Sequence, residues 1–507
     1  IQDVSAIRDF LRMLYKKGSD SDKFKYLLLF GDGSFDNKST HFDPGLKNCL
    51  PTFQSYESLY PTSSFVTDDF FGLLDYGENL ESGLLDLGIG RFPVLSPDDA
   101  SIIVDKIKHY TSKETLGDWR NLLCFIGDDE DGNRHMRDAN TLTEIVDSRY
   151  PTFNVDKIFL DAYQQIVTAT GETYPEVNRA INDRIKKGAL IMNYLGHGSE
   201  KGLAHENILS ISDIRSWDNY DKLPLFMTAT CEFSRFDDEN ISAGEWIFLN
   251  PNGGGIGLFT TTRLVYSSPN FRLNREFYDY IFEHNENGKY RFGDILRLTK
   301  NAVGSELNKL NFTLLGDPAM SLNYPEYSIK MTRINEHAVE SFADTLKALS
   351  EVEVEGYMAD LSGNKLSDYE GIVYPTVYDK KVTLTNLAND GGPLMEFGIQ
   401  KNILFRGKSS IENGHFKFSF LVPKDIGYNV GTGKFSFYGT NGETDASGVN
   451  LQINIGGSSD SVFSDVSGPE VKLFMNDTSF VYGGITNEDP VFLAKVHDLQ
   501  GINTTGN

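Results

Sequence analysis

The sequence predicts an α/β protein that is followed by an all-β region. Up to about residue 325, short apolar runs alternate with amphipathic helical patterns, as in a mostly parallel sheet flanked by helices. Beyond Pro325 the helical periodicity fades, and alternating runs such as 415–421 and 449–455 are typical of a β-sandwich. A chain of 507 residues has room for about three such units.

The elements of the α/β half follow from the positions of these runs. The predicted strands are 26–30, 87–90, 122–126, 189–195, 223–227 and 256–259. The predicted helices are 97–112, 134–148, 174–187 and 269–284. We divide the chain into two α/β subdomains at 1–115 and 116–325, a β-sandwich domain at 326–465, and the start of a further β domain at 466–507.

Composition excludes several classes of protein. The net charge of −25 argues against a nucleic-acid partner, and 12% aromatic residues indicate a packed chain. No apolar run is long enough for a membrane helix, and the chain does not begin with a secretory signal. Because it starts in a helical pattern and stops at a polar run, 503–507, we expect an excised fragment of a longer protein.

Glycine and polar residues follow the predicted strands at the points where the strands end. These positions are 31–33, 127–129, 196–198, 230–232 and 261–263. Ligands of open α/β sheets gather at the carboxyl ends of the strands. The sequence therefore places the chemistry of this protein along one edge of the sheet.

Three cysteines are present, an odd number that excludes a disulfide framework. Cys124 lies inside a predicted strand and is interpreted as a buried, inert thiol, while Cys49 lies in a loop without a nearby base. Cys231 ends an apolar strand and begins a polar run. It is therefore the candidate nucleophile, since a reactive thiol must be accessible and activated.

His197 is the candidate base for this thiol. It also ends an apolar strand, and glycines on both sides allow a ligand to approach the backbone closely. Two adjacent parallel strands would place imidazole and thiol side by side. A zinc site of His197, His205 and Cys231 is the alternative, but it lacks a closely spaced pair of ligands.

With these residues identified, the first 325 residues resemble the gingipain-like cysteine peptidases, whose catalytic domain has a caspase-like α/β fold. The landmarks that carry the resemblance are 26–32, 67–72, 86–92, 193–200, 228–231 and 315–318. Within the family the chain looks most like the sortases of the type IX secretion system. The features behind that likeness are the lead-in helix at 3–10, the loop at 127–136 and the long β region.

The resemblance implies roles for individual residues. Cys231 would be the nucleophile and His197 the general base, with the oxyanion held by the N–H groups of Gly198 and Cys231. An acid orients the histidine in the family. Asp128 or Asp129 stands at that place and Asp129 is preferred, while a solvated or calcium-binding loop is the alternative for this acidic run.

The resemblance also bears on the substrate pocket. Where arginine-specific relatives carry a second acid, this chain has Arg134 or His135, so a small or neutral residue is expected before the cut. Tyr266 occupies the place of an aromatic pocket wall, although it has the alternative of being ordinary surface.

Structural calcium is a further family property. Asp32 and Asp86 match the oxygen ligands, Asp75 would add a backbone carbonyl, and Glu78 or Glu81 is a less definite ligand. No organic cofactor is expected.

The function that the resemblance implies is a cell-surface sortase at the outer membrane of a Bacteroidota-type bacterium. It would remove the C-terminal signal domain of exported cargo through a thioester and transfer the cargo to an amine of lipopolysaccharide. An outer-membrane β-barrel of the secretion system would be its partner. The alternatives are a free-standing gingipain-like protease, a catalytically silent surface scaffold, and an adhesin that binds glycans through its β region.

Overall fold

The computed structural model describes residues 3–19, 23–36, 49–56, 59–169, 171–286, 288–458, 470–481, 483–487 and 489–497. The chain forms two compact units. The first consists of Ile1–Tyr324 together with Thr383–Ile399, and the second of Pro325–Val382 and Gln400–Asn507. Both ends of the chain and residues 466–469 of the predicted last domain lie outside the described residues.

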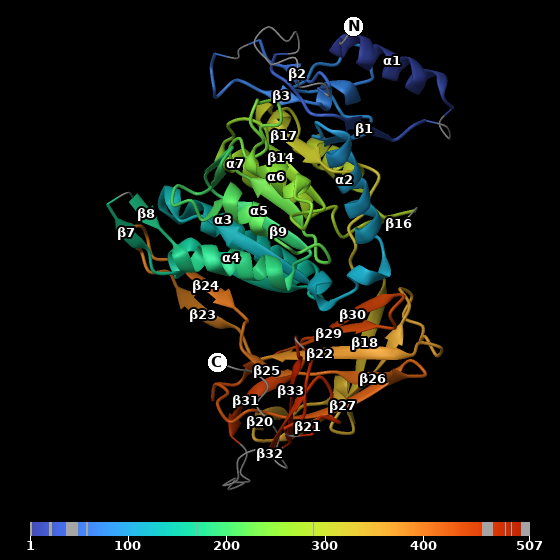
Figure 1. The fold of residues 1–507 in the computed structure, drawn as a ribbon, viewed down its shortest axis with the longest axis vertical. Coiled ribbons are helices and arrows are strands. Elements are labelled where there is room, and N and C mark those ends of the chain that lie inside the picture. Colours follow the sequence, from blue (N-terminus) through green and yellow to red (C-terminus); the bar gives the residue numbers. More distant parts are fainter. Residues whose placement is uncertain are drawn as a thin grey trace. The chain divides into compact units, whose positions relative to one another are not determined.

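An eight-stranded sheet forms the centre of the first unit (Figure 1). In spatial order its strands are β1 (Tyr26–Phe30), β4 (Gly88–Phe92), β17 (Phe312–Leu315), β14 (Gly257–Thr261), β13 (Leu225–Ala229), β9 (Ile191–Leu195), β5 (Leu122–Gly127) and β6 (Asn154–Phe159). Every pair is parallel except β14 with β17. All six predicted strands are confirmed, whereas β6 and β17 were not predicted.

Helices alternate with these strands along the chain. They are α1 (Val4–Lys17), α2 (Pro97–Tyr110), α3 (Glu130–Arg149), α4 (Pro175–Lys187), α5 (Ile211–Ser216), α6 (Ala243–Leu249), α7 (Ser267–Phe277) and α8 (Phe292–Ala302). Helix α7 ends seven residues earlier than the predicted helix 269–284, since turns follow Phe277. The other predicted helices are confirmed.

The sheet buries both of its faces. Side chains of α3, α7 and α8 pack with Leu225 and Met227 of β13 in one apolar core. Side chains of α2, α4, α5 and α6 pack with Phe226 in a second core on the other face. Because successive residues of a strand point to opposite faces, this alternation confirms the predicted sheet with helices on both sides.

The second unit is all-β, as predicted. Its main sheet runs β19 (His337–Ala338), β18 (Tyr327–Ile334), β21 (Glu351–Ala359), β27 (His415–Leu421), β26 (Ser409–Glu412), β22 (Gly371–Tyr378), β29 (Lys434–Thr440) and β30 (Asp445–Asn450), with β25 (Ile403–Arg406) beside β22. Strand β18 also pairs with β30, so the sheet closes on itself like a barrel.

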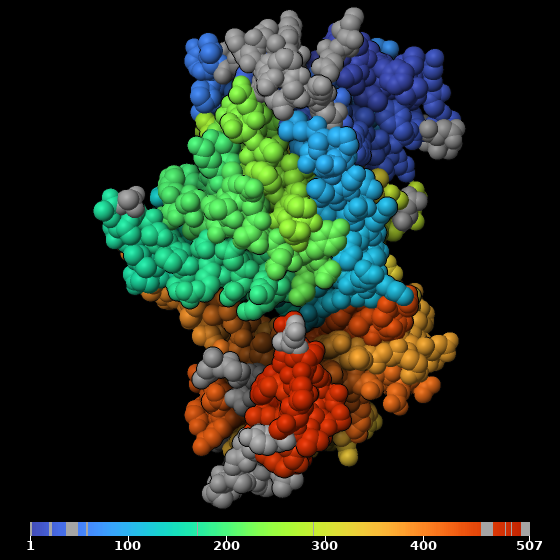
Figure 2. Space-filling model, in the orientation of Figure 1, coloured from blue at the N-terminus to red at the C-terminus, as the bar shows by residue number. Residues whose placement is uncertain are grey.

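In the described residues beyond 325, two two-stranded sheets share no strand with this sheet. Strands β32 (Glu470–Met475) and β33 (Phe492–His497) form a hairpin, and its side chains are largely exposed (red in Figure 2). Strands β23 (Val382–Thr385) and β24 (Glu396–Ile399) pair with each other. Residues 383–399, which we call the arm, interrupt the predicted domain 326–465 and belong to the first unit. Among the described residues, no helix combines the length and hydrophobicity that spanning a membrane requires.

Candidate active site

Two neighbouring strands bring the predicted nucleophile and base to one edge of the sheet. Strands β9 and β13 are adjacent and parallel, with Leu195 opposite Ala229. His197 and Cys231 each stand two residues beyond this pair. Because both strands end at the same edge, the imidazole and the thiol belong to the same rim, as the sequence predicts.

Gly198 allows the segments after these two strands to approach each other. A Cβ atom on Gly198 would lie 2.6 Å from Oγ1 of Thr230 and 3.2 Å from the carbonyl oxygen of Gly202. Any other residue would therefore push the histidine segment away from the cysteine segment. The predicted role of the Gly198 N–H in holding an oxyanion stays a prediction.

The thiol of Cys231 is half-buried, and both of its hydrogen bonds within the described residues are to the backbone of Val265. Its Sγ donates to the carbonyl of Val265 at 3.6 Å and accepts from the N–H of Val265 at 3.5 Å. Burial raises the pKa of the Cys231 thiol, an effect that the Val265 N–H partly offsets. Within the part of the chain that the structure describes, Sγ makes no hydrogen bond to His197. In this arrangement the thiol is protonated, and it ionises only when it comes within hydrogen-bond distance of the imidazole and transfers its proton.

The main chain of His197 is fixed by two buried side chains. Its N–H donates to Oδ2 of Asp128 at 2.7 Å, and its carbonyl accepts from the hydroxyl of Tyr194 at 2.6 Å. Asp128 and Tyr194 lie at the ends of β5 and β9, so the sheet itself sets the position of the histidine. Asp128 therefore holds the backbone of His197 and not its ring.

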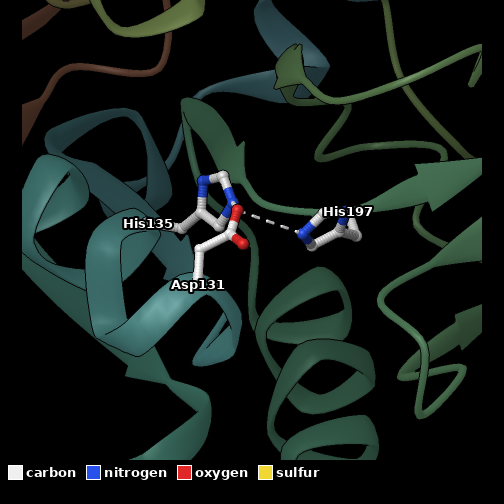
Figure 3. A group of neighbouring side chains, drawn as sticks. All are labelled: Asp131, His135 and His197. Carbon is white, nitrogen blue, oxygen red and sulfur yellow. Dashed lines mark ion pairs between the residues drawn. The ribbon is translucent and has the colours of Figure 1, made fainter. Parts of the chain in front are cut away.

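Three side chains surround the imidazole of His197. Nε2 lies 3.4 Å from Oδ2 of Asp131 (Figure 3). The ring of His205 stacks on it with centroids 4.8 Å apart, and the ring of His135 meets it edge-on at 5.3 Å. His205 in turn lies 3.2 Å from a carboxylate oxygen of Glu130. Asp131 is thus the acid that can orient the catalytic ring.

Asp129, the acid preferred from the sequence, lies elsewhere. Its carboxylate accepts a short hydrogen bond from the hydroxyl of Tyr174. Burial raises the pKa of Asp129 to about 8, and the neighbouring charges of Asp128 and Glu206 act in the same direction. The structure therefore brings Asp131, and not Asp129, to the imidazole.

Asp131 reaches the site because of an unusual turn at the start of α3. Asp131, Gly132 and Asn133 have φ angles of 55°, 63° and 63°, all in the left-handed region. Aspartate, glycine and asparagine are the residues that adopt this region most readily. The sequence Asp-Gly-Asn was therefore an available signal for a local break in the helix, whereas the prediction of Asp129 followed the place that the family resemblance gives to the acid, directly after the strand that holds Cys124.

The predicted substrate-binding residues differ in exposure. The side chain of Tyr266 is 59% exposed, and its backbone N–H donates to Oδ1 of Asn308 at 2.8 Å. It follows Val265, which contacts the thiol. His135 is buried beside His197, and burial lowers the pKa of its imidazole. Arg134 points to Ser268, with 3.2 Å between Nη2 and Oγ.

The predicted calcium ligands fall into two places. Asp75 and Asp86 lie close together with Glu78, with one carboxylate oxygen of each within 4.8 Å of the others. This set of hard oxygen donors suits calcium. Asp32 is not in this group. It is buried near Arg91 and Glu245, and burial raises its pKa well above the usual range.

The other two cysteines lack the surroundings of a nucleophile. Cys124 is fully buried within β5, and the backbone of the half-buried Cys49 forms an isolated β-bridge with the backbone of Asp32. Burial raises the pKa of the Cys49 thiol, and the Asp32 carboxylate raises it further. Neither thiol has a setting that would favour the thiolate.

The arm, residues 383–399, lies against the loops that shape this site. The carboxylate of Asp161 accepts hydrogen bonds from Asn386 Nδ2 and from the backbone N–H groups of Ala388 and Asn389 at 2.5, 3.0 and 2.9 Å. The side-chain amide of Asn133 donates to the carbonyl of Pro393 at 2.6 Å. The arm thereby supports the turn that carries Asp131. Nothing in the sequence pattern indicated this contact.

A thiol and an imidazole at the ends of adjacent central strands of an α/β sheet define a cysteine peptidase. The chain belongs to peptidase family C25, whose family model matches residues 1–323, and this is a family of cysteine peptidases. No curated protein matches the chain.

The two RgpB structures among the matches share this fold. The chain is similar to the Arg-specific cysteine proteinase gingipain R (RgpB), with 17% identity, a TM-score of 0.51 and coverage of 90% of this chain and 88% of that one. It is also similar to the complex of the pro- and mature domains of RgpB from Porphyromonas gingivalis, with 16% identity, a TM-score of 0.50 and 90% coverage of both chains. A third match is dimeric latent PorU from the same organism, with 24% identity and a TM-score of 0.39. It covers all of this chain but only 43% of that one.

Proposed function

We propose that this cysteine peptidase is a sortase of the type IX secretion system. Its substrates are the C-terminal signal domains of exported cargo proteins, and its acceptor is an amine on lipopolysaccharide at the cell surface. The peptidase chemistry rests on one observation, the register that sets His197 and Cys231 two residues beyond Leu195 and Ala229. The sortase role is supported by the sequence likeness, in which helix α1, the loop at 127–136 and the β region take part.

The reaction begins with transfer of the Cys231 proton to His197. The thiolate attacks the carbonyl carbon of the scissile peptide bond, and the resulting oxyanion is held by the N–H groups of Gly198 and Cys231. His197 then returns the proton to the leaving nitrogen of the signal domain, which departs as an amine. The cargo remains bound to Sγ as a thioester.

The thioester has two possible fates, and both use the same base. His197 removes a proton from an incoming amine or water, the nucleophile attacks the thioester carbon, and Sγ leaves and is reprotonated. An amine gives cargo joined to lipopolysaccharide through an amide. Water gives cargo with a free carboxylate.

The surroundings of the dyad favour a neutral residue before the cut. Asp131 is shared by the imidazoles of His135 and His197 at 3.4 Å each, so it is not free to bind a basic substrate side chain. Arg134, which precedes His135 in the chain, would repel such a side chain. The exposed ring of Tyr266 follows Val265, which contacts the thiol, and would form a pocket wall.

Two further parts of the proposal concern metal and location. Asp75, Glu78 and Asp86 would hold a structural calcium ion, for which their clustered carboxylates fit. The enzyme would act on the outer face of the outer membrane and dock on a β-barrel partner of the secretion system.

Mass spectrometry of a cargo protein incubated with the enzyme and lipopolysaccharide tests the proposal. We expect loss of the C-terminal signal domain and an amide-linked new C-terminus. Cys231→Ala should fold and abolish both products. Cleavage that yields only a free carboxylate would overturn the sortase role and leave a protease. Normal processing by Cys231→Ala would overturn the assignment of Cys231 as the nucleophile.

A catalytically silent scaffold is the second candidate, because Sγ is paired with Val265 and burial raises the pKa of the thiol. Alkylation by iodoacetamide separates the two. A sortase should be alkylated rapidly at Cys231 at neutral pH, and more slowly when His197 is replaced by alanine. A slow rate that His197→Ala does not change would favour the scaffold.

A further inference from the structure

Two histidines and an aspartate meet at one point on the rim of the sheet. Asp131, His135 and His197 each offer one ligand atom, and these three atoms lie within 4.8 Å of one another (Figure 3). Oδ2 of Asp131 is 3.4 Å from Nε2 of His135 and 3.4 Å from Nε2 of His197. Two side chains come from the first turns of α3 and the third from the end of β9, so the cluster joins segments that are distant in sequence.

His135 supplies the observation that points to a ligand. Its side chain is more than nine-tenths buried, and its Nε2 makes no hydrogen bond of normal geometry among the described residues, although Oδ2 of Asp131 lies 3.4 Å away. In Figure 3 the ring faces the carboxylate of Asp131. A buried polar atom without a well-formed hydrogen bond is uncommon in folded proteins and calls for an ion or a water. Here the atom is aimed at two other ligand atoms.

The spacing of the three atoms suits zinc. Zinc binds histidine nitrogen and carboxylate oxygen at about 2.0–2.2 Å in tetrahedral geometry, which places neighbouring ligand atoms roughly 3.3–3.5 Å apart. The two separations of 3.4 Å fall in this range. Two histidines and one carboxylate, with a fourth position open to water, are a known zinc donor set.

The turn that carries Asp131 is held in place from outside. Asn133, in the same left-handed turn, donates to the carbonyl of Pro393 in the arm at 2.6 Å. His135 follows Asp131 by four residues. The carboxylate is therefore presented by a supported turn, which lowers the cost of ordering the ligands when a metal binds.

We propose that Asp131, His135 and His197 bind Zn²⁺, and that zinc at this site switches the peptidase off. A neutral imidazole has one protonated nitrogen and one basic nitrogen. Zinc on Nε2 of His197 uses the lone pair of the basic nitrogen, and the ring proton then stays on Nδ1. The ring then cannot accept the proton of the Cys231 thiol. The inhibition rests on the proposed role of His197 as the base, whereas the binding site does not.

Zinc titration of the whole chain in a Cys231→Ala background tests the site. This background keeps all three ligands and removes the reactive thiol. We expect one high-affinity site, weakened more than about tenfold by His135→Asn and by Asp131→Asn, because even outer-shell partners are worth about 10- to 100-fold in metal affinity. The matched control is His415→Asn, which removes an exposed histidine of the other unit and should leave the affinity unchanged.

Cobalt spectroscopy of the unmodified protein gives a test that needs no variant. Co²⁺ bound by two histidines and a carboxylate shows visible d–d bands without a sulfur-to-cobalt charge-transfer band. A strong charge-transfer band, or loss of the zinc site in Cys231→Ala, would place the metal on the thiol and overturn the proposal. Equal affinity in His135→Asn and His415→Asn would overturn it as well.

Activity separates this inference from the proposed function. If the enzyme cleaves cargo, micromolar zinc should inhibit it, a chelator should restore it, and His135→Asn should shift the inhibition to higher zinc. Cleavage that remains unaffected while the site is saturated would overturn the switch. If no cargo is cleaved under any condition, the binding data still decide the site, and the failure belongs to the proposed function.

Discussion

The carboxylate of Asp131 lies 3.4 Å from Nε2 of His197, while the carboxylate of Asp129 accepts a hydrogen bond from the hydroxyl of Tyr174. Two acids separated by one residue therefore have different surroundings. Only the first can align the catalytic ring and stabilise it when it becomes positively charged.

Asp131→Asn should lower kcat by about tenfold or more with little change in KM, because the imidazolium loses its partner. Asp129→Asn is the matched control and should lower kcat less. The measurement is steady-state cleavage of a cargo peptide in buffer with a chelator. A larger loss from Asp129→Asn would return the orienting role to the acid that the sequence favoured.

Gly198→Ala should lower activity by separating the two catalytic segments. The new Cβ would meet Oγ1 of Thr230 at 2.6 Å and its Cγ2 at 3.2 Å. Thr230→Ala removes both atoms, so the double variant should recover part of the lost kcat. Thr230→Ala alone gives the baseline. No recovery in the double variant would show that the clash with Thr230 is not the cause of the loss.

The sequence predicted the sheet, most helices and the positions of Cys231 and His197, because these depend on local patterns. Apolar runs mark the strands, and the rule that parallel strands end at one edge brings distant residues together. Strand β6 was missed since Asp156 and Lys157 interrupt its apolar pattern. Both are buried, and Asp156 is paired with Arg184.

The identity of the orienting acid was not predictable by the same reasoning. The family resemblance favoured Asp129 because it follows the strand that holds Cys124. The carboxylate that reaches the ring depends instead on the left-handed turn at Asp131 and on the contact of Asn133 with Pro393, about 260 residues later. Such long-range contacts leave no periodic pattern. The assignment of the arm to the first unit was missed for the same reason.

Asp161→Ala should destabilise the first unit and release the arm. It removes the acceptor for Asn386 Nδ2 and for the N–H groups of Ala388 and Asn389. Unpaired buried donors cost about 1–3 kcal/mol. The free energy of unfolding in urea and proteolysis within 383–399 would measure the effect.

The control for this variant is Asp218→Ala, at an exposed position, which should change the free energy of unfolding by about 0.5 kcal/mol or less. Equal stability of the two variants, with the arm still resistant to protease, would mean that Asp161 does not hold the arm.

Lys106 should make the stability of the protein rise with pH in the alkaline range. Its ammonium is buried and donates to the carbonyls of Phe248 and Asn250 at 2.7 and 3.3 Å. Burial lowers the pKa of Lys106 to about 7, below the ordinary value of 10.5 that applies to the unfolded chain. Between these two values the unfolded state binds the extra proton, so the free energy of unfolding increases as pH rises from about 7 to about 10.5.

Lys106→Met removes this titration while keeping most of the side-chain volume. The free energy of unfolding in urea is measured for both proteins at pH 7 and pH 9.5. The contributions of the other titrating groups cancel in the difference between the two proteins. The stability of the wild type relative to Lys106→Met should be greater at pH 9.5 than at pH 7. A constant difference would mean that Lys106 keeps its proton in the folded state, held by the carbonyls that end α6.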